Sequence, residues 1–433
     1  MSARFKNSSK TLVALAALAA TASFAQSFVT LSGRASMDVS TFEAAGATAN
    51  TATNNYDFNK RVRVADTSSR ITFAAQEDLG AGSRAGVYCE TGINIDNAAA
   101  TGQANTANVN TSEFCSREGR LYYGNNLAEI RLGRQNVWWT QGALNQVGSR
   151  HMGSDSMTNL QNGGVGVYGV RVENMVMINF NGDAGAFAGS QVYAGRMGGV
   201  TGEGATAQTS FTGTSATQAN PAAIGQYGGF KLAYTSGAMV GLIDYQSSHN
   251  SPGTGTVIGA TTVATGNANS FDRTAIKYGL GYKYAGVSSP SIVSVQMWDK
   301  KRTDLTAPTA GLVLSGGTTG LGTLQTGSGK DHGIGFNVEH DLGGNNMLVA
   351  QYSKANNLKD KDGVDMVDTG ATAYTIGFRK ALSKRTHLYT AYHTIKNDKN
   401  VNYNMSGGNY SSAANVANGA QIKMMSLGMQ HDF

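Results

Sequence analysis

The chain of 433 residues combines 40% hydrophobic residues with only 14% charged residues, whereas soluble globular domains carry about 25% charged residues. Its 56 glycines are about twice the usual share, and it has only 4 prolines. The 18 tyrosines, 15 phenylalanines and low charge argue against disorder, and the scarcity of proline excludes a collagen-like fibre. The net charge is +6, but no lysine- and arginine-rich run indicates nucleic-acid binding.

Residues 1–25 are predicted to be an export signal. A basic start is followed by an apolar stretch and by small residues before the expected cleavage at Gln26; the features are Arg4, Lys6 and Lys10, then 12–20, then Ser23 and Ala25. A membrane anchor is the alternative, but a membrane-spanning helix needs a longer apolar run. Removal of the segment takes away three positive charges and no acid, which lowers the net charge from +6 to +3. The mature chain is expected to span 26–433.

Alternation of apolar and polar residues recurs through the mature chain. It is clear in 29–39, in 275–284 and in 332–340, where Ile334, Phe336 and Val338 share one face. Successive side chains of a β-strand point to opposite faces, so this period of two predicts strands with two different faces. No helix of convincing length is expected, and the predicted fold class is all-β.

The predicted connections are alternately short and long. Eight long stretches rich in Gly, Asn, Thr and Ser are 41–60, 96–112, 136–165, 197–224, 249–270, 303–329, 358–368 and 399–420. The short turns are expected at 78–82, 125–126, 236–237, 342–345 and 383–386. Long loops on one side and short turns on the other are typical of a transmembrane antiparallel β-barrel. This pattern predicts about 16 strands, with long extracellular loops and short periplasmic turns.

The polar rows favour a water-filled interior over a dry core. They are rich in Gly, Ser, Thr and Asn with occasional Arg and Lys, whereas a β-sandwich or β-helix, the alternatives, would bury branched aliphatic residues on one face. Tyrosines recur at the ends of the apolar rows, where an aromatic belt would meet the membrane interfaces; they are Tyr123, Tyr282, Tyr284, Tyr352 and Tyr392.

Short segments along the whole mature chain resemble the trimeric general porins of Gram-negative bacteria, and among these the porins of betaproteobacteria. The segments are 26–33, 68–73, 76–80, 132–135, 381–386 and 429–433. The resemblance implies a homotrimer in the outer membrane, in contact with its lipid and lipopolysaccharide. It also implies that 136–165 folds inward to narrow the pore. Phe433 resembles the family's signal for the barrel-assembly machinery.

The resemblance also implies a basic wall in the constriction, at Arg34, Arg70, Arg134 and Arg171. The alternation of apolar and polar residues independently supports three of these positions, because Arg34, Arg70 and Arg171 fall on the polar faces of their strands. Arg134 falls on the same strand face as the apolar Ile130 and Leu132, so it points into the pore only if the strand bulges before the loop. Its neighbour Arg131 falls on the inward face and is the substitute candidate for this position. Arg84 and Arg120 are also expected to face inward. In the alternative interpretation, each of these arginines is simply solvated or is a strut of the wall, paired with Glu90, Glu129 or Glu173.

The predicted inward loop carries few acids. Asp155 stands against Arg150 and His151, so a constriction with several arginines should be net positive. Because rings of charged side chains bias which ions enter a pore, we expect a channel for passive diffusion of ions and small hydrophilic solutes that prefers anions.

Cys89 and Cys115 flank the second long loop and are expected almost opposite each other on adjacent strands. Export to an oxidising compartment makes a disulfide plausible, and two free thiols are the alternative.

Two other functions remain possible from the sequence. A channel with a saturable site for one solute would look similar. An outer-membrane enzyme would need a nucleophile or acid beside a histidine, and His387 and His393 lack a carboxylate between them. His, Cys, Asp and Glu do not cluster as metal ligands do. We therefore expect no enzymatic activity, cofactor or metal.

Overall fold

The computed structural model describes residues 28–48, 57–93, 95, 114–137, 144, 152, 154, 156–161, 163–165, 171–196, 226–250, 256–258, 261–263, 271–304, 327–405 and 416–433. The predicted export signal, 1–25, lies outside the described residues.

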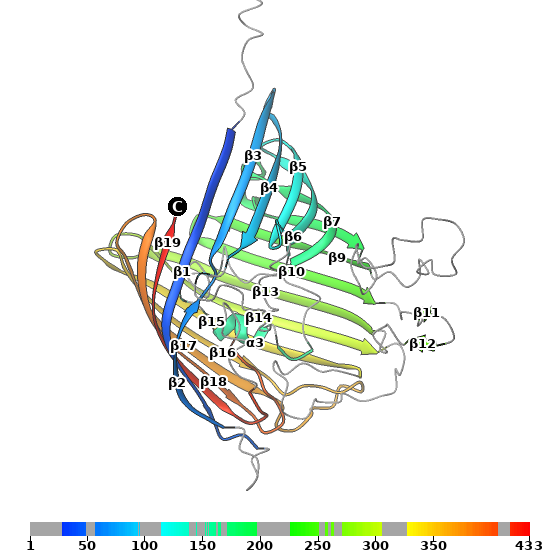
Figure 1. Ribbon diagram of the computed structural model, residues 1–433, viewed down its shortest axis with the longest axis vertical. Coiled ribbons are helices and arrows are strands. Elements are labelled where there is room, and N and C mark those ends of the chain that lie inside the picture. Colours follow the sequence, from blue (N-terminus) through cyan, green and yellow to red (C-terminus); the bar gives the residue numbers. More distant parts are fainter. Residues whose placement is uncertain are drawn as a thin grey trace, which may run out of the picture.

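One large antiparallel sheet dominates these residues (Figure 1). Its strands are β1 (Phe28–Ala45), β2 (Phe58–Asp66), β3 (Arg70–Gly80), β4 (Ser83–Gly92), β5 (Glu118–Gly124), β6 (Ala128–Asn136), β7 (Arg171–Phe180), β8 (Gln191–Arg196), β9 (Gln226–Ser236), β10 (Met239–Asn250), β13 (Phe271–Ala285), β14 (Pro290–Asp304), β15 (Gly329–Gly343), β16 (Asn346–Ala355), β17 (Ala371–Ala381), β18 (Thr386–Asn397) and β19 (Gln421–Asp432). A separate hairpin consists of β11 (Thr256–Ile258) and β12 (Thr261–Val263).

The sheet closes on itself because its first and last strands pair. β1 pairs with β19 from Arg34 opposite Asp432 to Ala45 opposite Gln421. On its other edge, β1 pairs with β3 through its first residues and with β2 through its last. β2 and β3 are therefore two parts of one interrupted strand. The barrel has sixteen antiparallel strands, as predicted.

Short and long connections alternate around the ring and lie at its two ends. The eight long connections fall on the eight stretches predicted from composition. Two short connections were not singled out in the sequence: 286–289, and 181–190, which contains the 3-10 helix η1 (Gly182–Phe187). A helical turn of this kind replaces the two-residue hairpin that Gly and Asn usually mark.

The two faces of the strands differ as the alternation predicts. In β15, Phe336 and Val338 are 46% and 37% exposed on the outer face, whereas Asn337 and Glu339 on the inner face are fully buried. Tyr123, Tyr282 and Tyr392 are likewise exposed on the outside. An apolar outer band around a polar interior is the arrangement that a bilayer requires of a barrel.

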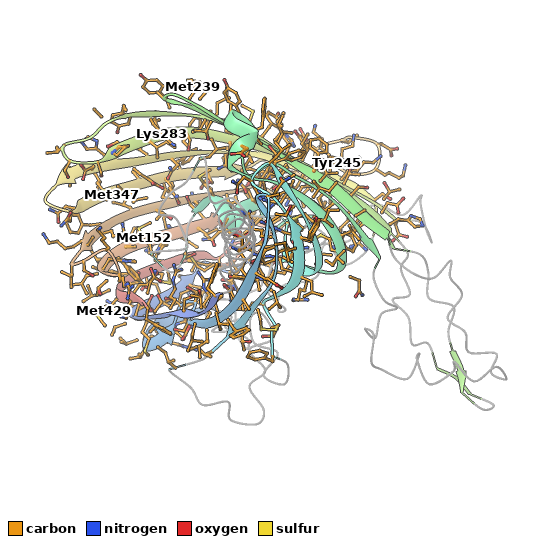
Figure 2. All side chains as sticks on the ribbon, turned by 90° about the horizontal axis from the view of Figure 1, so that it is seen from above. Met152, Met239, Tyr245, Lys283, Met347 and Met429 are labelled. Carbon is orange, nitrogen blue, oxygen red and sulfur yellow. A yellow bond between two sulfur atoms is a disulfide. The ribbon has the colours of Figure 1, made fainter. Side chains whose placement is uncertain are left out.

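Part of the segment 136–165 fills the interior beside β15–β18. It contains the short helix α3 (Ser156–Gln161), whose six residues are all buried and which contacts these four strands (Figure 1). Room is made by inward glycines: a side chain at Gly335 would crowd Met157, and one at Gly377 would collide with Met152 (labelled in Figure 2). No helix in the described parts of the chain is long and apolar enough to cross a membrane.

Candidate pore constriction

Charged residues gather on the inner face of β3–β7, which we call the basic wall. The strand register places Thr72, Glu90 and Glu118 side by side across β3, β4 and β5, while Leu121 and Ile130, of opposite parity, are exposed outside. The basic wall consists of Arg70, Arg84, Arg117, Arg120, Arg131 and Arg171 together with Glu90, Glu118 and Glu129.

Glu90 lies at the centre of one group of residues in the basic wall. Its carboxylate accepts a bond of 2.6 Å from Nε of Arg117 and lies 3.4 Å from Nε of Arg70. The hydroxyl of Tyr88 donates to the same carboxylate at 3.2 Å. Arg171 interacts electrostatically with this group. Two guanidinium groups therefore contact one carboxylate, and a third acts on it electrostatically.

The other arginines of the basic wall with a measured ion pair are bound by Glu129 or Glu118. Nη2 of Arg131 lies 2.6 Å and Nη2 of Arg84 lies 3.1 Å from the Glu129 carboxylate. Nη1 of Arg120 lies 2.8 Å from Glu118. The Arg120 guanidinium also lies 4.0 Å from the centre of the Tyr88 ring, which is a cation–π contact.

Six arginines thus face three glutamates on the basic wall. Because a guanidinium stays charged at any physiological pH, these described residues of the basic wall carry an excess of three positive charges. The side chain of Glu173 lies outside the described residues. The two interpretations from the sequence are compatible: Arg70 and Arg131 are paired with acids, and the wall as a whole still keeps its positive charge.

Arg34 has a different environment from the other predicted arginines. It is buried, and its Nε lies 2.8 Å from Asp432 at the β1–β19 seam. Next to it, Gly33 and Phe433 exchange backbone hydrogen bonds of 2.9 and 3.0 Å. A side chain at Gly33 would collide with the Phe433 ring. Arg34 is therefore part of the closure of the barrel and is paired with Asp432, although it lies opposite Arg70 in the register of β1 and β3.

Arg134 lies at an irregularity of β6. The register between β6 and β7 shifts between Gly133 and Gln135, and Gly133 has a positive φ of 127°. Such a backbone favours glycine, and a shift of this kind marks a β-bulge. The bulge on which an inward Arg134 depended is therefore present, and the side chain is half-buried.

The alternation of inward and outward side chains that was expected around Arg171 is interrupted. Val172 was expected on the lipid side with Val176, but it is buried in a cluster with Met175 and Met177, while Val176 is 51% exposed. Asn174 has a positive φ of 52° between them, and this local change of backbone breaks the alternation.

The segment 136–165 is fastened to the wall opposite the arginines. Nζ of Lys300 donates to the backbone oxygens of Gln161 and Gly163 at 2.7 and 2.6 Å, and lies 3.1 Å from Asp331. The Asp331 carboxylate in turn accepts from the Val165 amide at 2.9 Å. This fully buried Lys300–Asp331 pair is one anchor of the segment. The Ser156 amide also donates to the Thr375 hydroxyl at 3.0 Å, and Nε2 of Gln161 donates to Oε1 of Gln296 at 3.1 Å. Asp155, Arg150 and His151 lie outside the described residues.

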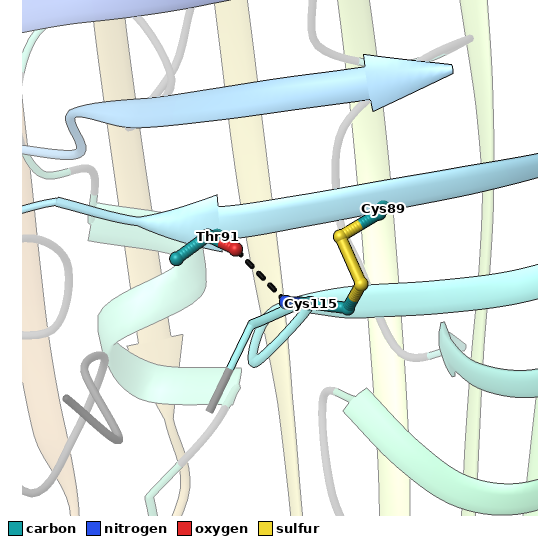
Figure 3. Close-up of a disulfide and its surroundings, with 3 residues drawn as sticks. All are labelled: Cys89, Thr91 and Cys115. Atoms are coloured by element: carbon teal, nitrogen blue, oxygen red, sulfur yellow. Dashed lines mark hydrogen bonds between the residues drawn. A yellow bond between two sulfur atoms is a disulfide. The ribbon is translucent and has the colours of Figure 1, made fainter. Parts of the chain in front are cut away.

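The two cysteines form a disulfide, as the sequence allows (Figure 3). In the sequence it lies next to two residues of the basic wall. Cys89 directly precedes Glu90, and Cys115 is two residues before Arg117. The Cys115 amide donates to Oγ1 of Thr91 at 2.9 Å, and the Arg117 amide donates to the backbone oxygen of Glu90 at 2.9 Å. The disulfide thus holds Arg117 against Glu90.

Arg117 was not predicted from the sequence because it precedes β5. Outside a regular strand, the alternation of residues does not indicate which way a side chain points. Its position two residues after a cysteine opposite Cys89 is the signal that could have identified it.

Replacing both Cys89 and Cys115 by serine is expected to weaken the anion preference and lower stability, by about 3 kcal/mol on the chain-entropy model of a disulfide. Arg117→Gln should weaken the anion preference as much as the double serine variant does, although its disulfide is intact. Zero-current potentials and thermal unfolding of both variants are the measurements. An unchanged potential in the serine variant would show that the disulfide does not position Arg117.

The two histidines of β18 contact other side chains on the inner face of the barrel. Nδ1 of His393 lies 3.0 Å from the Thr375 hydroxyl, and Nδ1 of His387 lies 3.4 Å from Arg379. Within the described ranges, no group of three or more His, Cys, Asp or Glu residues could hold a metal ion.

Comparison with known families agrees with the barrel. The sequence model described as "Gram-negative porin" matches residues 11–400. The chain belongs to this family. It is therefore an outer-membrane β-barrel protein, as predicted. No curated protein was found to match the sequence.

Solved structures with the same fold include three outer-membrane proteins. An anion-selective porin from Comamonas acidovorans is 21% identical, with a TM-score of 0.59 over 94% of this chain and 100% of that chain. The trimer form of OmpT from Vibrio cholerae is 11% identical, with a TM-score of 0.57 over 94% and 99%. The outer-membrane channel DcaP of Acinetobacter baumannii is 14% identical, with a TM-score of 0.52 over 94% and 97%.

Proposed function

We propose that this porin forms a water-filled channel for passive diffusion of ions and small hydrophilic solutes, and that it prefers anions. The observation that carries the preference is the excess of arginine over glutamate on the basic wall. In a water-filled lumen, selectivity rests on size and on the field of the wall, and a fixed positive field concentrates anions. The anion selectivity of the porin from Comamonas acidovorans, which shares the fold, supports the same proposal.

Single-channel recording tests passive diffusion against a saturable site. For the proposed pore, current carried by chloride, phosphate or a small organic anion should rise in proportion to concentration. Saturation at low concentration, together with block of chloride current by one solute, would instead favour a channel with a dedicated binding site. Assays of the purified protein for lipid and peptide hydrolysis should show no activity, and turnover would contradict a purely passive role.

We propose that the working unit is a homotrimer whose subunits meet through β19, β1 and β2. The outer faces of β1 and β2 expose valine and leucine, such as Leu31, Val39 and Val64. Most exposed aromatic residues of the outer face lie instead on β9–β18, with Tyr123 on β5 as an exception; they include Tyr234, Tyr278, Tyr282, Tyr374 and Tyr392. Aromatic residues mark lipid interfaces, so the aliphatic face is the one suited to a second copy of the chain. The solved trimer form of OmpT supports this assembly.

Val39→Trp combined with Val64→Trp should therefore lower the trimer fraction of the purified protein in detergent, because bulky rings separate a close-packed subunit interface. Analytical ultracentrifugation measures the fraction. Ile376→Trp, on the aromatic side and 59% exposed, is the matched control and should leave the trimer intact. Equal dissociation of all variants would contradict this choice of interface.

The C-terminal Phe433 remains a predicted signal for the barrel-assembly machinery. Its half-exposed ring beside the seam is accessible to such a partner. Contact of the outer face with lipid and lipopolysaccharide is part of the same proposal.

A further inference from the structure

The apolar outer face of β13–β15 ends abruptly at its long-loop end. Along neighbouring strands, Tyr278, Met297 and Ile334 lie in one row across the register. Four residues further, Thr274, Lys301 and Lys330 form the corresponding row. At 3.3 Å per residue, this second row lies about 13 Å beyond the first. It therefore lies where the hydrocarbon band ends and the headgroups of the outer leaflet begin.

Three lysines face one another in that charged row. Lys301 is directly opposite Lys330 on the adjacent strand, and Lys330 forms an isolated bridge with Lys359. Lys359 forms an ion pair of 3.0 Å with Asp365. Lys301 and Lys330 form no ion pair with any described residue, and both are exposed. Like charges directly opposite in a sheet repel each other and destabilise it, so this row is stabilised when an anion binds between them.

A cavity of about 460 Å³ lies at the same place. Lys301, Lys330 and Lys359 line it together with Asp299 and His332, and Tyr245 (labelled in Figure 2) and Ile276 add apolar surface. Lys300 and Asp331, the buried pair within the wall, also border it, so four lysines outnumber two aspartates and the cavity is basic. It combines a cationic rim with an apolar side next to the bilayer.

We propose that this cavity binds a phosphate group of an outer-leaflet glycolipid, with Lys301 and Lys330 donating charge-assisted hydrogen bonds to its oxygens. Ammonium groups bind phosphate strongly as point charges, and Tyr245 and Ile276 contact the adjoining apolar part of the lipid. This inference rests on the proposed outer-membrane orientation and gives a defined place to the lipopolysaccharide contact. Lys301 and Lys330, on which the proposal rests, take no part in the basic wall or in the contacts that hold the segment 136–165.

Native mass spectrometry of the full chain, refolded in detergent without lipid, tests the proposal. The probes are lipid A with both phosphates, the same lipid without phosphate, and inorganic phosphate. The unaltered chain should retain the phosphorylated lipid A and not the dephosphorylated form. Lys301→Gln with Lys330→Gln should weaken that binding at least tenfold. Lys354→Gln with Lys396→Gln, two exposed lysines of the same rim outside the cavity, should leave it unchanged.

Two results would overturn the proposal. Equal loss of binding in both lysine pairs would show only a general attraction to the rim. Binding of inorganic phosphate at this cavity without binding of the lipid would identify a soluble anion as the occupant. Zero-current potentials recorded on the same variants keep the two proposals separate, because the outer lysines should not change ion selectivity, whether or not the lipid binds.

Discussion

Replacing Arg70, Arg117 and Arg171 together by glutamine is expected to shift the zero-current potential of the channel strongly toward cation preference. The change leaves Glu90, around which the three guanidinium groups gather, uncompensated. A unit charge 4 Å from an ion in water contributes about 1 kcal/mol, roughly a fivefold change in relative permeability for each charge that an ion passes closely. The anion-to-cation permeability ratio should therefore fall by an order of magnitude or more.

Arg34→Gln is the matched control for this result. It removes an arginine that the resemblance also assigned to the constriction but that is paired with Asp432 at the seam. We expect a much smaller change of potential than for any arginine around Glu90. If Arg34→Gln shifted the potential as much as the triple variant, the selective charges would not be those of the basic wall.

Lys300→Met is expected to loosen the attachment of residues 161–165 to the wall and to raise single-channel conductance and open-channel noise. The substitution removes the donors to Gln161 and Gly163 and leaves Asp331 buried without its cation. Loss of one partner of a buried pair is destabilising by about 3–5 kcal/mol. Planar-bilayer recording gives both the conductance and the noise.

A second variant keeps this prediction testable if the single substitution prevents folding. Lys300→Met with Asp331→Leu removes both charges, which is often tolerated, and still removes the hydrogen bonds to the segment. Lys423→Met, whose ion pair with Glu43 is exposed at 3.5 Å, is the control and should conduct normally. Unchanged conductance in the folded double variant would show that Lys300 and Asp331 do not hold the segment in place.

The barrel could be predicted almost completely from the sequence. A period of two needs no knowledge of distant contacts, and each loop is recognisable by its composition. β15 illustrates this, because Phe336 and Asn337 take the outer and inner faces that their polarity predicts. The short connection at 181–190 escaped prediction because it is a helical turn without a tight hairpin.

The constriction was predictable only where the strands are regular. Parity placed Arg70 and Arg131 correctly on the inner face, but the backbone changes near Gly133 and Asn174 are set by local pairing that one sequence does not reveal. The helix α3 is too short for its period to be visible, and its burial depends on glycines from distant strands such as Gly335. The role of Arg117 depends on the disulfide as well as on its own position.

The zero-current potential of the unaltered channel in a planar bilayer under a gradient of potassium chloride tests the account most directly. Because three positive charges of the basic wall are in excess, the sign of the potential should show that chloride crosses more easily than potassium. A potential of the opposite sign, with potassium the more permeant ion, would contradict the proposal that the arginines of β3–β7 set the selectivity of this pore.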